Sequence, residues 1–350
     1  MARIAVIPGD GIGKEVVPEG VRMLELLDRQ HGLGLRYETF DLGADRYIRD
    51  GTTMPPETMA RLRDEFDAIY LGALGDPRVP TNVHAKDILL GARFQLDLYI
   101  NLRPIRLLDE RRCPIKGKRA EDVDMIVFRE NTEGLYTGVG GQFKRGTPDE
   151  VAIEQEINTR KGVERIIRAA FEYAKKHHRR SVCMSDKANA MRHGHELWQR
   201  TFKEVAAEYP GITTFHRYVD VLAMEMVQSP ERFDVIVTNN LFGDIVTDLG
   251  AALQGGIGLA ASGNIHPGKV SLFEPVHGSA PDIAGKGIAN PFGALLSAGM
   301  LLAHLGRDDL RSRIEEAIRA SLLAGQVTRE LGGTLGTRAA ADAVLERLAS

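Results

Sequence analysis

The chain has 350 residues, of which 43% are hydrophobic and 27% charged, and its net charge is -3. This length exceeds the usual limit of a single hydrophobic core, so one large or two medium domains are expected. The balanced charge argues against a nucleic-acid or membrane partner. Cys113 and Cys183 lie in unrelated contexts without metal-ligand spacing. The sequence shows no signal peptide and no apolar run of about 18 residues, which predicts a cytoplasmic protein.

The apolar run at residues 3–7 predicts a strand, and the glycine-rich segment 8–13 and a helical pattern follow it. This order suggests a dinucleotide-binding fold, but Lys14 stands where the third glycine of Gly-x-Gly-x-x-Gly belongs. The glycines therefore also fit a simple tight turn of the backbone. A second strand is expected at residues 68–72, and the alternation of strands and helices predicts an α/β fold.

Three arginines are candidate carboxylate ligands. A helix expected over residues 87–97 carries, at spacings of three and four, Leu89, Leu90 and Arg93. Arg103 stands directly before a proline, which favours an extended conformation, and Arg129 ends a predicted strand. Guanidinium groups bind carboxylates bidentately, so the three arginines are expected to converge on one carboxylate. Each arginine alone equally fits a solvated surface position.

The middle of the chain contains a predicted arm and a candidate base. Residues 137–158 are glycine-rich and then alternate, which indicates a projecting β-arm of the kind that pairs across dimers. Lys187 follows a predicted strand and is a plausible proton acceptor if burial lowers its pKa. Asp220 precedes a predicted helix. The nearby His193, His195 and His216 are assigned no role, because lone histidines usually make ordinary hydrogen bonds.

Two carboxylates follow the strand predicted at residues 233–238. A helix that begins near Phe242 places Asp244 and Asp248 on one face, because they are four positions apart. Carboxylates at such a junction form a hard-oxygen site suited to Mg²⁺ or Mn²⁺. An acidic first turn that suits the helix dipole is the alternative. Further on, the small residues of the loop 272–285 allow backbone N–H groups to approach a ligand closely.

Together, these motifs resemble the β-decarboxylating dehydrogenases of 3-isopropylmalate, isocitrate, homoisocitrate, tartrate and D-malate, and most closely the isopropylmalate branch. The resemblance covers essentially the whole chain and rests on Ile7-Pro8-Gly9-Asp10-Gly11-Ile12-Gly13, Arg93 with Asn101-Leu102-Arg103-Pro104, Arg129-Glu130-Asn131-Thr132-Glu133-Gly134, Asp186-Lys187-Ala188-Asn189, Asp244-Ile245-Val246-Thr247-Asp248 and Glu274-Pro275-Val276-His277-Gly278-Ser279-Ala280-Pro281-Asp282.

The resemblance implies a two-domain α/β subunit that is not a Rossmann fold. It has a mixed central sheet flanked by helices and an active-site cleft between the domains. The first domain would contain residues 1–100 and 251–350, with the NAD loop, and the second residues 101–250. The family forms homodimers or larger homo-oligomers with shared active sites, and an arm such as residues 137–158 clasps the dimer.

The resemblance also implies roles for individual residues. Asp244, Asp248 and Asp220 of the partner subunit would hold Mg²⁺ or Mn²⁺. The catalytic groups would be Lys187 as acceptor of the hydroxyl proton, Asp220, and Tyr136 as proton donor to the enol. Arg93, Arg103 and Arg129 would position the 3-carboxylate of the substrate, with Asp220 nearby.

The resembled loop also predicts the cofactor. Asp282 would accept hydrogen bonds from ribose hydroxyls and repel a 2′-phosphate, which favours NAD over NADP. The residues expected to bind NAD are Ile12, Asn189, Glu274, His277, Gly278, Ser279, Ala280, Asp282 and Asn290.

The substrate is predicted from the helix that carries Arg93. Isocitrate enzymes have Ser and Asn six and four residues before this arginine, where this chain has Asp87 and Leu89. Leu89 and Leu90 instead offer an apolar pocket for an isopropyl group, where one methylene counts for roughly 1–3 kcal/mol. The expected reaction converts 3-isopropylmalate to 4-methyl-2-oxopentanoate in leucine biosynthesis. Tartrate or D-malate is the alternative, and isocitrate and homoisocitrate are less favoured. A non-catalytic carboxylate-binding protein and a metal-dependent lyase are rivals from other classes.

Overall fold

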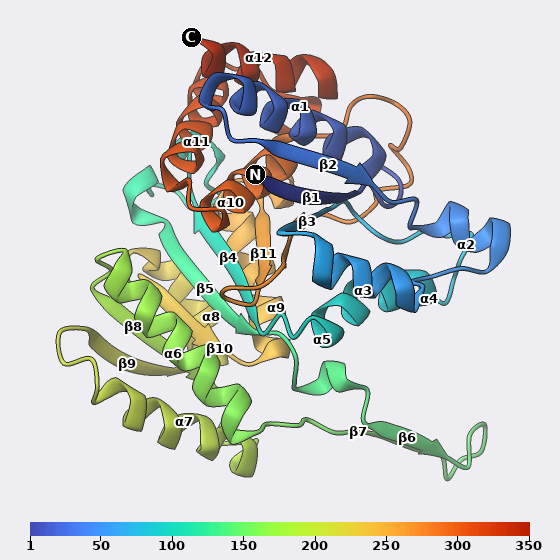
Figure 1. The fold of residues 1–350 in the computed structure, drawn as a ribbon. Coiled ribbons are helices and arrows are strands. Elements are labelled where there is room, and N and C mark those ends of the chain that lie inside the picture. Colours follow the sequence, from blue (N-terminus) through green and yellow to red (C-terminus); the bar gives the residue numbers. More distant parts are fainter. The chain divides into compact units, whose positions relative to one another are not determined.

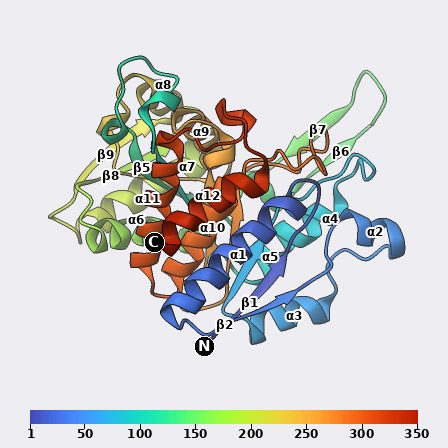
Figure 2. The ribbon, with the colours of Figure 1, turned by 90° about the horizontal axis from the view of Figure 1, so that it is seen from above.

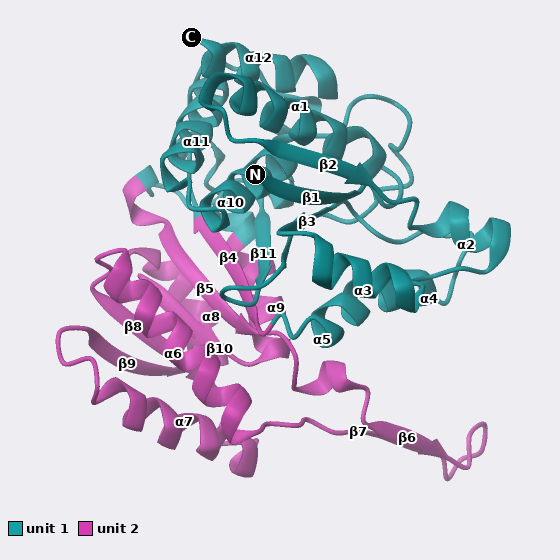
Figure 3. Ribbon diagram, viewed as in Figure 1, with its two compact units in different colours: residues 1–98, 106–120, 251–350 teal, residues 99–105, 121–250 magenta.

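The computed structural model describes residues 1–350, and the chain forms two compact units (Figures 1 and 3). Unit 1 consists of Met1–Leu98, Arg106–Ala120 and Ala251–Ser350, and unit 2 of Tyr99–Ile105 and Glu121–Gly250. Both ends of the chain therefore lie in unit 1, and the middle of the chain forms unit 2. None of the helices combines the length and the apolar composition that a bilayer-spanning helix needs.

The strands of unit 1 form a mixed sheet. In spatial order they are β2 (Leu35–Thr39), β1 (Ala2–Ile7), β3 (Ala68–Leu71), β12 (Ser271–Pro275) and β11 (Ala261–Ile265). β1 is parallel to β2 and to β3, β12 is parallel to β3, and β11 is antiparallel to β12. All four residues of β3 are buried, which explains why this strand is apolar along its whole length.

Helices complete unit 1, and some of them pack against its sheet. Those of regular α type are α1 (Gly13–His31), α2 (Ala44–Asp50), α3 (Pro56–Glu65), α4 (Val83–Ala85), α5 (Gly91–Gln95), α10 (Phe292–His304), α11 (Asp308–Leu323) and α12 (Thr337–Ala349). α10 is buried along most of its length, and the Tyr70 hydroxyl donates to the carbonyl oxygen of its Ala294 at 2.7 Å. A π-helical turn, Lys86–Leu90, links α4 to α5, and its Ile88 packs into the same core as Leu62 and Ile69.

Unit 2 contains a second set of strands, in the order β4 (Ile100–Arg106), β5 (Asp124–Glu130), β10 (Val235–Thr238), β8 (Ser181–Asp186) and β9 (Thr213–Tyr218). β10 is parallel to β5 and to β8, and β8 is parallel to β9. The helices of this unit are α6 (Arg160–Lys176), α7 (Arg192–Ala206), α8 (Val219–Gln228) and α9 (Asn240–Leu253). Because β5, β10, β8 and β9 are parallel, their carboxyl ends lie at one edge of the sheet, with the segments that follow them.

Short 3₁₀ turns complete the two units: Glu110–Arg112, Ala120–Asp122, Leu135–Thr137, Pro230–Arg232, Ile257–Leu259 and Arg329–Leu331.

An antiparallel hairpin occupies the segment in which the arm is expected. Its strands are β6 (Gly140–Phe143) and β7 (Val151–Glu154), and they project from the rest of unit 2 (Figures 1 and 2). Phe143 is 65% exposed and Ile153 51% exposed. An isolated hairpin with exposed apolar side chains is marginally stable in water, so these strands favour a further partner.

The mixed sheet flanked by helices confirms the predicted α/β class, whereas the unit boundaries differ from the expectation, since unit 2 begins at Tyr99 instead of residue 101. Residues 106–120 were expected in the middle domain, but they belong to unit 1. Arg106 pairs with Glu315, and Arg111 donates to the Leu322 carbonyl at 2.9 Å. The residues in each contact are more than 200 positions apart, so no local sequence pattern predicts these contacts.

Candidate active site

Two carboxylates project from the first turns of α9 in unit 2. The Asn239 side chain caps this helix, because its Oδ1 accepts a hydrogen bond from the Phe242 backbone at 2.9 Å. The helix therefore begins two residues before the expected position, and Asp244 and Asp248 lie one turn apart on it. The Asp244 side chain is 37% exposed, so it is accessible to a ligand.

Two of the three predicted arginines converge on Asp244. Arg103 lies 3.4 Å from its Oδ1 through Nη2, and 3.9 Å from an Asp248 oxygen through Nη1. Arg129 donates to the same Asp244 oxygen through Nη1. The side chains of Arg103 and Arg129 are only 9% and 1% exposed. Buried guanidinium groups require charged or polar partners, so this pair forms a preformed anion-binding corner.

Residues that the sequence analysis did not single out hold these arginines in place. Asn240 Oδ1 accepts from Arg129 Nε at 3.0 Å and Nη2 at 2.7 Å, and Thr247 Oγ1 accepts from Arg103 at 2.6 Å. A Cβ at Gly243 would lie 2.5 Å from Arg129 Cγ, so only glycine fits there. These residues could have been predicted from their spacing, because it places Asn240, Gly243 and Thr247 on the same face of the helix as Asp244.

Tyr136 reaches the same carboxylate from the base of the arm. Its hydroxyl donates to Asp244 Oδ2 at 2.7 Å, and its ring lies 5.1 Å from the Arg129 guanidinium. Gly134, with φ of +78°, turns the chain just before the 3₁₀ turn that carries Tyr136. Asp244 therefore accepts hydrogen bonds from two arginines and a tyrosine.

Lys187 and Asp220 contact each other within one chain. The Lys187 Nζ lies 2.7 Å from Asp220 Oδ1, and this hydrogen bond lowers the pKa of Asp220. The described chain contains no group of three or more His, Cys, Asp and Glu side chains arranged to hold a metal ion. Asp220 thus does not complete a three-carboxylate cluster with Asp244 and Asp248 of its own chain.

The electrostatics of Asp248 differ from those of Asp220. Partial desolvation raises the pKa of Asp248, and the nearby Asp244 carboxylate adds to this effect, while Arg103 opposes it. A carboxylate whose charged form is disfavoured in this way gains from a bound cation. Asp244 and Asp248 supply hard oxygen ligands on one accessible helix face, and this donor set fits Mg²⁺ or Mn²⁺.

The third arginine lies in unit 1. Arg93 is 5% exposed, and its Nη2 lies 3.3 Å from Glu274 Oε1, which also accepts from Asn264 Nδ2 at 2.9 Å. Leu89 and Leu90 are half-buried on the π-helical turn, and Leu89 packs against the hydrophobic core. Glu274, expected to bind the cofactor, is thus engaged with Arg93.

The glycine loop after β1 supports a second loop. Ile12 N donates to the Ser279 carbonyl at 2.9 Å, and a Cβ on Gly11 would lie 2.0 Å from that oxygen. The Glu15 carboxylate accepts from the backbone of Gly285 at 2.5 Å and of Gly287 at 2.9 Å. The glycines therefore allow a tight turn and a close backbone contact. This favours the tight-turn interpretation of the motif over the dinucleotide-binding one.

The loop held in this way presents buried polar groups without protein partners. His277 is 7% exposed and Asn290 4% exposed, yet His277 Nε2 and Asn290 Nδ2 have no hydrogen-bond partner. Burial lowers the pKa of His277, so its ring is neutral near pH 7. Each unpaired buried group costs about 1–3 kcal/mol, which a polar ligand would recover. Of the other expected cofactor residues, Gly278, Asp282 and Asn189 are exposed, and Ala280 has an unusual φ of +41°.

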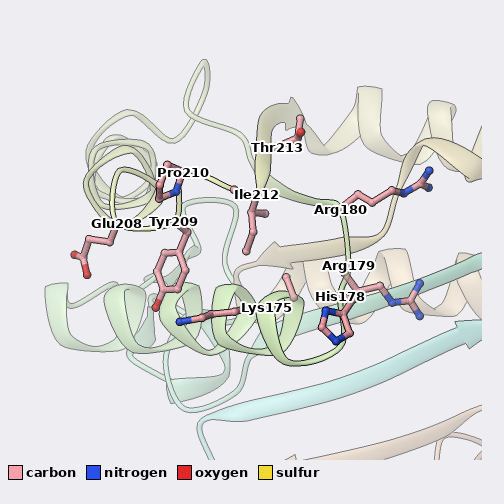
Figure 4. Close-up of a pocket in the computed structure, with 11 residues that line it drawn as sticks. Lys175, His178, Arg179, Arg180, Glu208, Tyr209, Pro210, Ile212 and Thr213 are labelled. Carbon is pink, nitrogen blue, oxygen red and sulfur yellow. The ribbon is translucent and has the colours of Figure 1, made fainter.

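A pocket in unit 2 lies away from these residues. It has a volume of about 650 Å³ and lies beside the links from α6 to β8 and from α7 to β9, where it is lined by Ala174, Lys175, His178, Arg179, Arg180, Glu208, Tyr209, Pro210, Gly211, Ile212 and Thr213 (Figure 4). These residues lie before β8 and before or at the start of β9, whereas Lys187 follows β8. A strand of this length spans roughly 20 Å. The pocket is therefore separate from the candidate active site.

Comparisons with known proteins agree with this geometry. A family model described as isocitrate/isopropylmalate dehydrogenase matches residues 3–346. A 3-isopropylmalate dehydrogenase of Thermobifida fusca is 47% identical, over 99% of this chain and 98% of that protein. One from Streptomyces griseus is 48% identical, over 96% of this chain and 98% of that protein.

Solved structures give the same result. The isocitrate dehydrogenase from Methylococcus capsulatus superposes with a TM-score of 0.91 at 38% identity, over 100% of both chains. The TT0538 protein from Thermus thermophilus superposes with a TM-score of 0.88 at 36% identity, over 99% of this chain and 68% of that one. The chain belongs to the isocitrate/isopropylmalate dehydrogenase family, as its motifs predict.

Proposed function

We propose that this protein catalyses the NAD-dependent oxidative decarboxylation of 3-isopropylmalate to 4-methyl-2-oxopentanoate, a step of leucine biosynthesis. The observation that carries the proposal is the convergence of Arg103, Arg129 and Tyr136 on Asp244 at the carboxyl edge of unit 2. This arrangement combines anion-binding groups, a proton donor and metal-binding oxygens in one place. The names of the relatives with 47% and 48% identity support the choice of substrate.

The metal site of the proposal consists of Asp244 and Asp248, joined by Asp220 of a neighbouring subunit. Mg²⁺ or Mn²⁺ held there would lower the pKa of the substrate 2-hydroxyl and stabilise the charge that develops on its oxygen. Asp220 keeps its negative charge to low pH because Lys187 lowers its pKa, which suits a metal ligand.

The arginines bind and orient the substrate. In the structure, Arg103 and Arg129 each direct one donor at the same Asp244 oxygen, and a substrate carboxylate can accept hydrogen bonds from both guanidinium groups. We propose Arg93 as the third guanidinium of the substrate site. Their burial fixes the orientation of the donors before the substrate arrives, which lowers the entropic cost of reaching the reactive geometry.

The remaining side chains move protons. Lys187 would accept the 2-hydroxyl proton, directly or through a water, when C2 is oxidised. The bond from C3 to the carboxylate then breaks, CO₂ leaves, and its electron pair forms the enol. Tyr136 supplies the proton that C3 requires to give the final 2-oxo acid, and Asp244 holds its hydroxyl in position at 2.7 Å.

The loop of unit 1 accounts for the cofactor part of the proposal. His277 Nε2 and Asn290 Nδ2 are unpaired and buried, so they fit the hydrogen-bonding edge of the adenine ring. Asp282 would accept from the ribose hydroxyls, as expected for NAD. NAD held by these residues would supply the acceptor for the hydride that the substrate loses.

The remaining parts of the proposal concern specificity and assembly. Asp87 accepts from Thr53 Oγ1 at 2.7 Å, and the neighbouring Leu89 and Leu90 suit an apolar substituent rather than a third carboxylate. We also propose that the protein is cytoplasmic. We further propose a homodimer, because the exposed apolar side chains of the hairpin, such as Phe143, favour pairing with a second copy.

The experiment that tests this function compares kcat/KM for NADH formation with five substrates in the presence of Mg²⁺: 3-isopropylmalate, D-malate, tartrate, homoisocitrate and isocitrate. The highest value is expected for 3-isopropylmalate. A higher value for D-malate or tartrate would assign the leucine pair to packing and change the substrate. Absence of NADH with all five would favour a binding protein or a lyase.

A further inference from the structure

A buried polar cluster lies behind Lys187 in unit 2. It consists of Glu156, which follows the hairpin; His195, in the first turn of α7; and Asn239, which caps α9. His195 is 0% exposed, Asn239 3%, and the Glu156 side chain 8%. None of the three belongs to the substrate, metal or cofactor residues of the proposed function.

The hydrogen bonds of His195 fix the position of its ring proton. Its Nδ1 lies 2.7 Å from the backbone nitrogen of Lys187, which can only donate, so Nδ1 is the acceptor. Nε2 must therefore carry the proton, and it lies 3.3 Å from Glu156 Oε2 and 3.4 Å from Oε1. A doubly protonated ring would direct a donor at the Lys187 N–H. His195 is consequently a neutral imidazole with a defined tautomer.

Glu156 is the charged carboxylate that accepts the hydrogen bond from His195. Burial acts to raise the pKa of Glu156, but the hydrogen bonds from His195 and Asn239 outweigh it, and the pKa is lowered overall. The Asn239 Nδ2 donates to Glu156 Oε1 at 2.6 Å. Asn239 Oδ1 in turn accepts from the first turn of α9. One chain of hydrogen bonds therefore connects the backbone of Lys187 with the helix that carries Asp244 and Asp248.

Packing around the cluster leaves its members little freedom. The His195 ring meets Phe242 edge to face with centroids 5.5 Å apart, and Trp198 Nε1 donates to Asn158 Oδ1 at 2.8 Å. On the other side of Lys187, Asp186 Oδ1 accepts from the backbone of Ala188 and lies 3.0 Å from His216 Nε2. The peptide on which Lys187 stands is thus anchored on both sides.

We propose that His195, oriented by Glu156, is a positioning residue that fixes the backbone of Lys187 relative to α9. This inference rests on the proposed function, in which Lys187 accepts the hydroxyl proton. The lysine side chain has four rotatable bonds, so its amine is placed accurately only if its peptide is held. A displacement of about 1 Å at a reacting group costs on the order of 100-fold in rate.

The test compares two amide substitutions at one position. The Oδ1 of His195→Asn can occupy the place of Nδ1 and accept from Lys187, whereas His195→Gln extends its amide towards Glu156 and leaves the Lys187 N–H without an acceptor. The proposal predicts a kcat about 10- to 100-fold lower for His195→Gln, and recovery of most of that loss in His195→Asn. KM for the hydroxy acid and for NAD should change less than about threefold in both. His193→Gln, on the exposed face of the same helix, is the matched control.

A purely structural role would produce a different result. Both variants would then lose activity in parallel with their thermal stability, and His195→Asn would give no recovery, which would overturn the proposal. A second measurement does not depend on catalytic activity. In the ¹⁵N NMR spectrum of the imidazoles, His195 should be neutral and protonated at Nε2. Protonation at Nδ1 would also overturn it. If the wild type forms no NADH, the proposed function fails, while the NMR result still decides whether His195 holds the Lys187 peptide.

Discussion

The candidate substrate residues of unit 2 and the candidate cofactor residues of unit 1 differ in how their polar groups are satisfied. In unit 2, Asp244 already accepts from Arg103, Arg129 and Tyr136. In unit 1, His277 and Asn290 are buried with unpaired donor or acceptor atoms. A ligand in unit 2 must exchange existing partners, whereas a ligand in unit 1 supplies missing ones. Substitutions should therefore mainly affect catalysis in unit 2 and cofactor affinity in unit 1.

The largest effect is expected for Lys187→Ala. Without the proton acceptor, kcat should fall about 10³-fold, while Mg²⁺ and NADH binding stay measurable by calorimetry. Asp220 would lose its charged partner, but it is exposed, so the fold should tolerate the change. Turnover close to that of the wild type would remove Lys187 from the mechanism.

Arg129→Lys tests the preformed corner of unit 2. Lysine keeps the charge but cannot contact Asn240 and Asp244 at once, as Arg129 does. We expect kcat/KM to fall about 100-fold, which corresponds to about 2.7 kcal/mol of transition-state stabilisation. Arg180→Lys, at a side chain that is 83% exposed, is the control. Equal kinetics for the two variants would mean that the corner does not bind substrate.

Asn290→Ser tests the unpaired groups of unit 1. Serine can replace Asn290 Oδ1, which accepts from the Phe292 backbone N–H at 3.1 Å at the start of α10, but it lacks the unpaired Nδ2. The dissociation constant of NADH, measured by fluorescence titration, should rise about 5- to 10-fold, with little change in kcat. Unchanged affinity would show that the amide nitrogen faces no cofactor atom, and the contrast between the units would then weaken.

The smallest expected effect is the pH dependence of metal binding. The pKa of Asp248 is raised, so its carboxylate takes up a proton at a higher pH than an ordinary aspartate does. Since Mg²⁺ binds only the deprotonated form, its affinity should already weaken at acidic pH values above the ordinary pKa of an aspartate. Asp248→Asn should bind Mg²⁺ more weakly and with a flatter pH dependence. A wild-type affinity that is constant over this range would contradict the assignment.

The sequence allowed the α/β class and the family to be predicted, because motifs with fixed local spacing carry both. It also indicated Asp244 and Asp248, since a four-residue spacing alone places them on one helix face. The helix start was off by two residues, because Asn239 acts as its cap. The roles of Asn240 and Thr247 depend on arginines more than 100 positions away, so they required the fold.

The histidines show most clearly which roles could not be predicted from the sequence. His195 was given no role because nothing in its neighbourhood distinguishes it from His193, yet one is fully buried and the other exposed. Its contacts with Glu156 and Lys187 arise only when α7, the base of the hairpin and the end of β8 come together. The placement of residues 106–120 in unit 1 likewise depends on long-range contacts.

The most direct test of the central claim is the stoichiometry of the reaction with 3-isopropylmalate, NAD and Mg²⁺. NADH can be followed by absorbance, CO₂ by release from substrate labelled in the 3-carboxylate, and the 2-oxo acid by mass spectrometry. The proposed reaction predicts one CO₂ and one 4-methyl-2-oxopentanoate for each NADH. NADH without CO₂, or CO₂ without NADH, would contradict an oxidative decarboxylation.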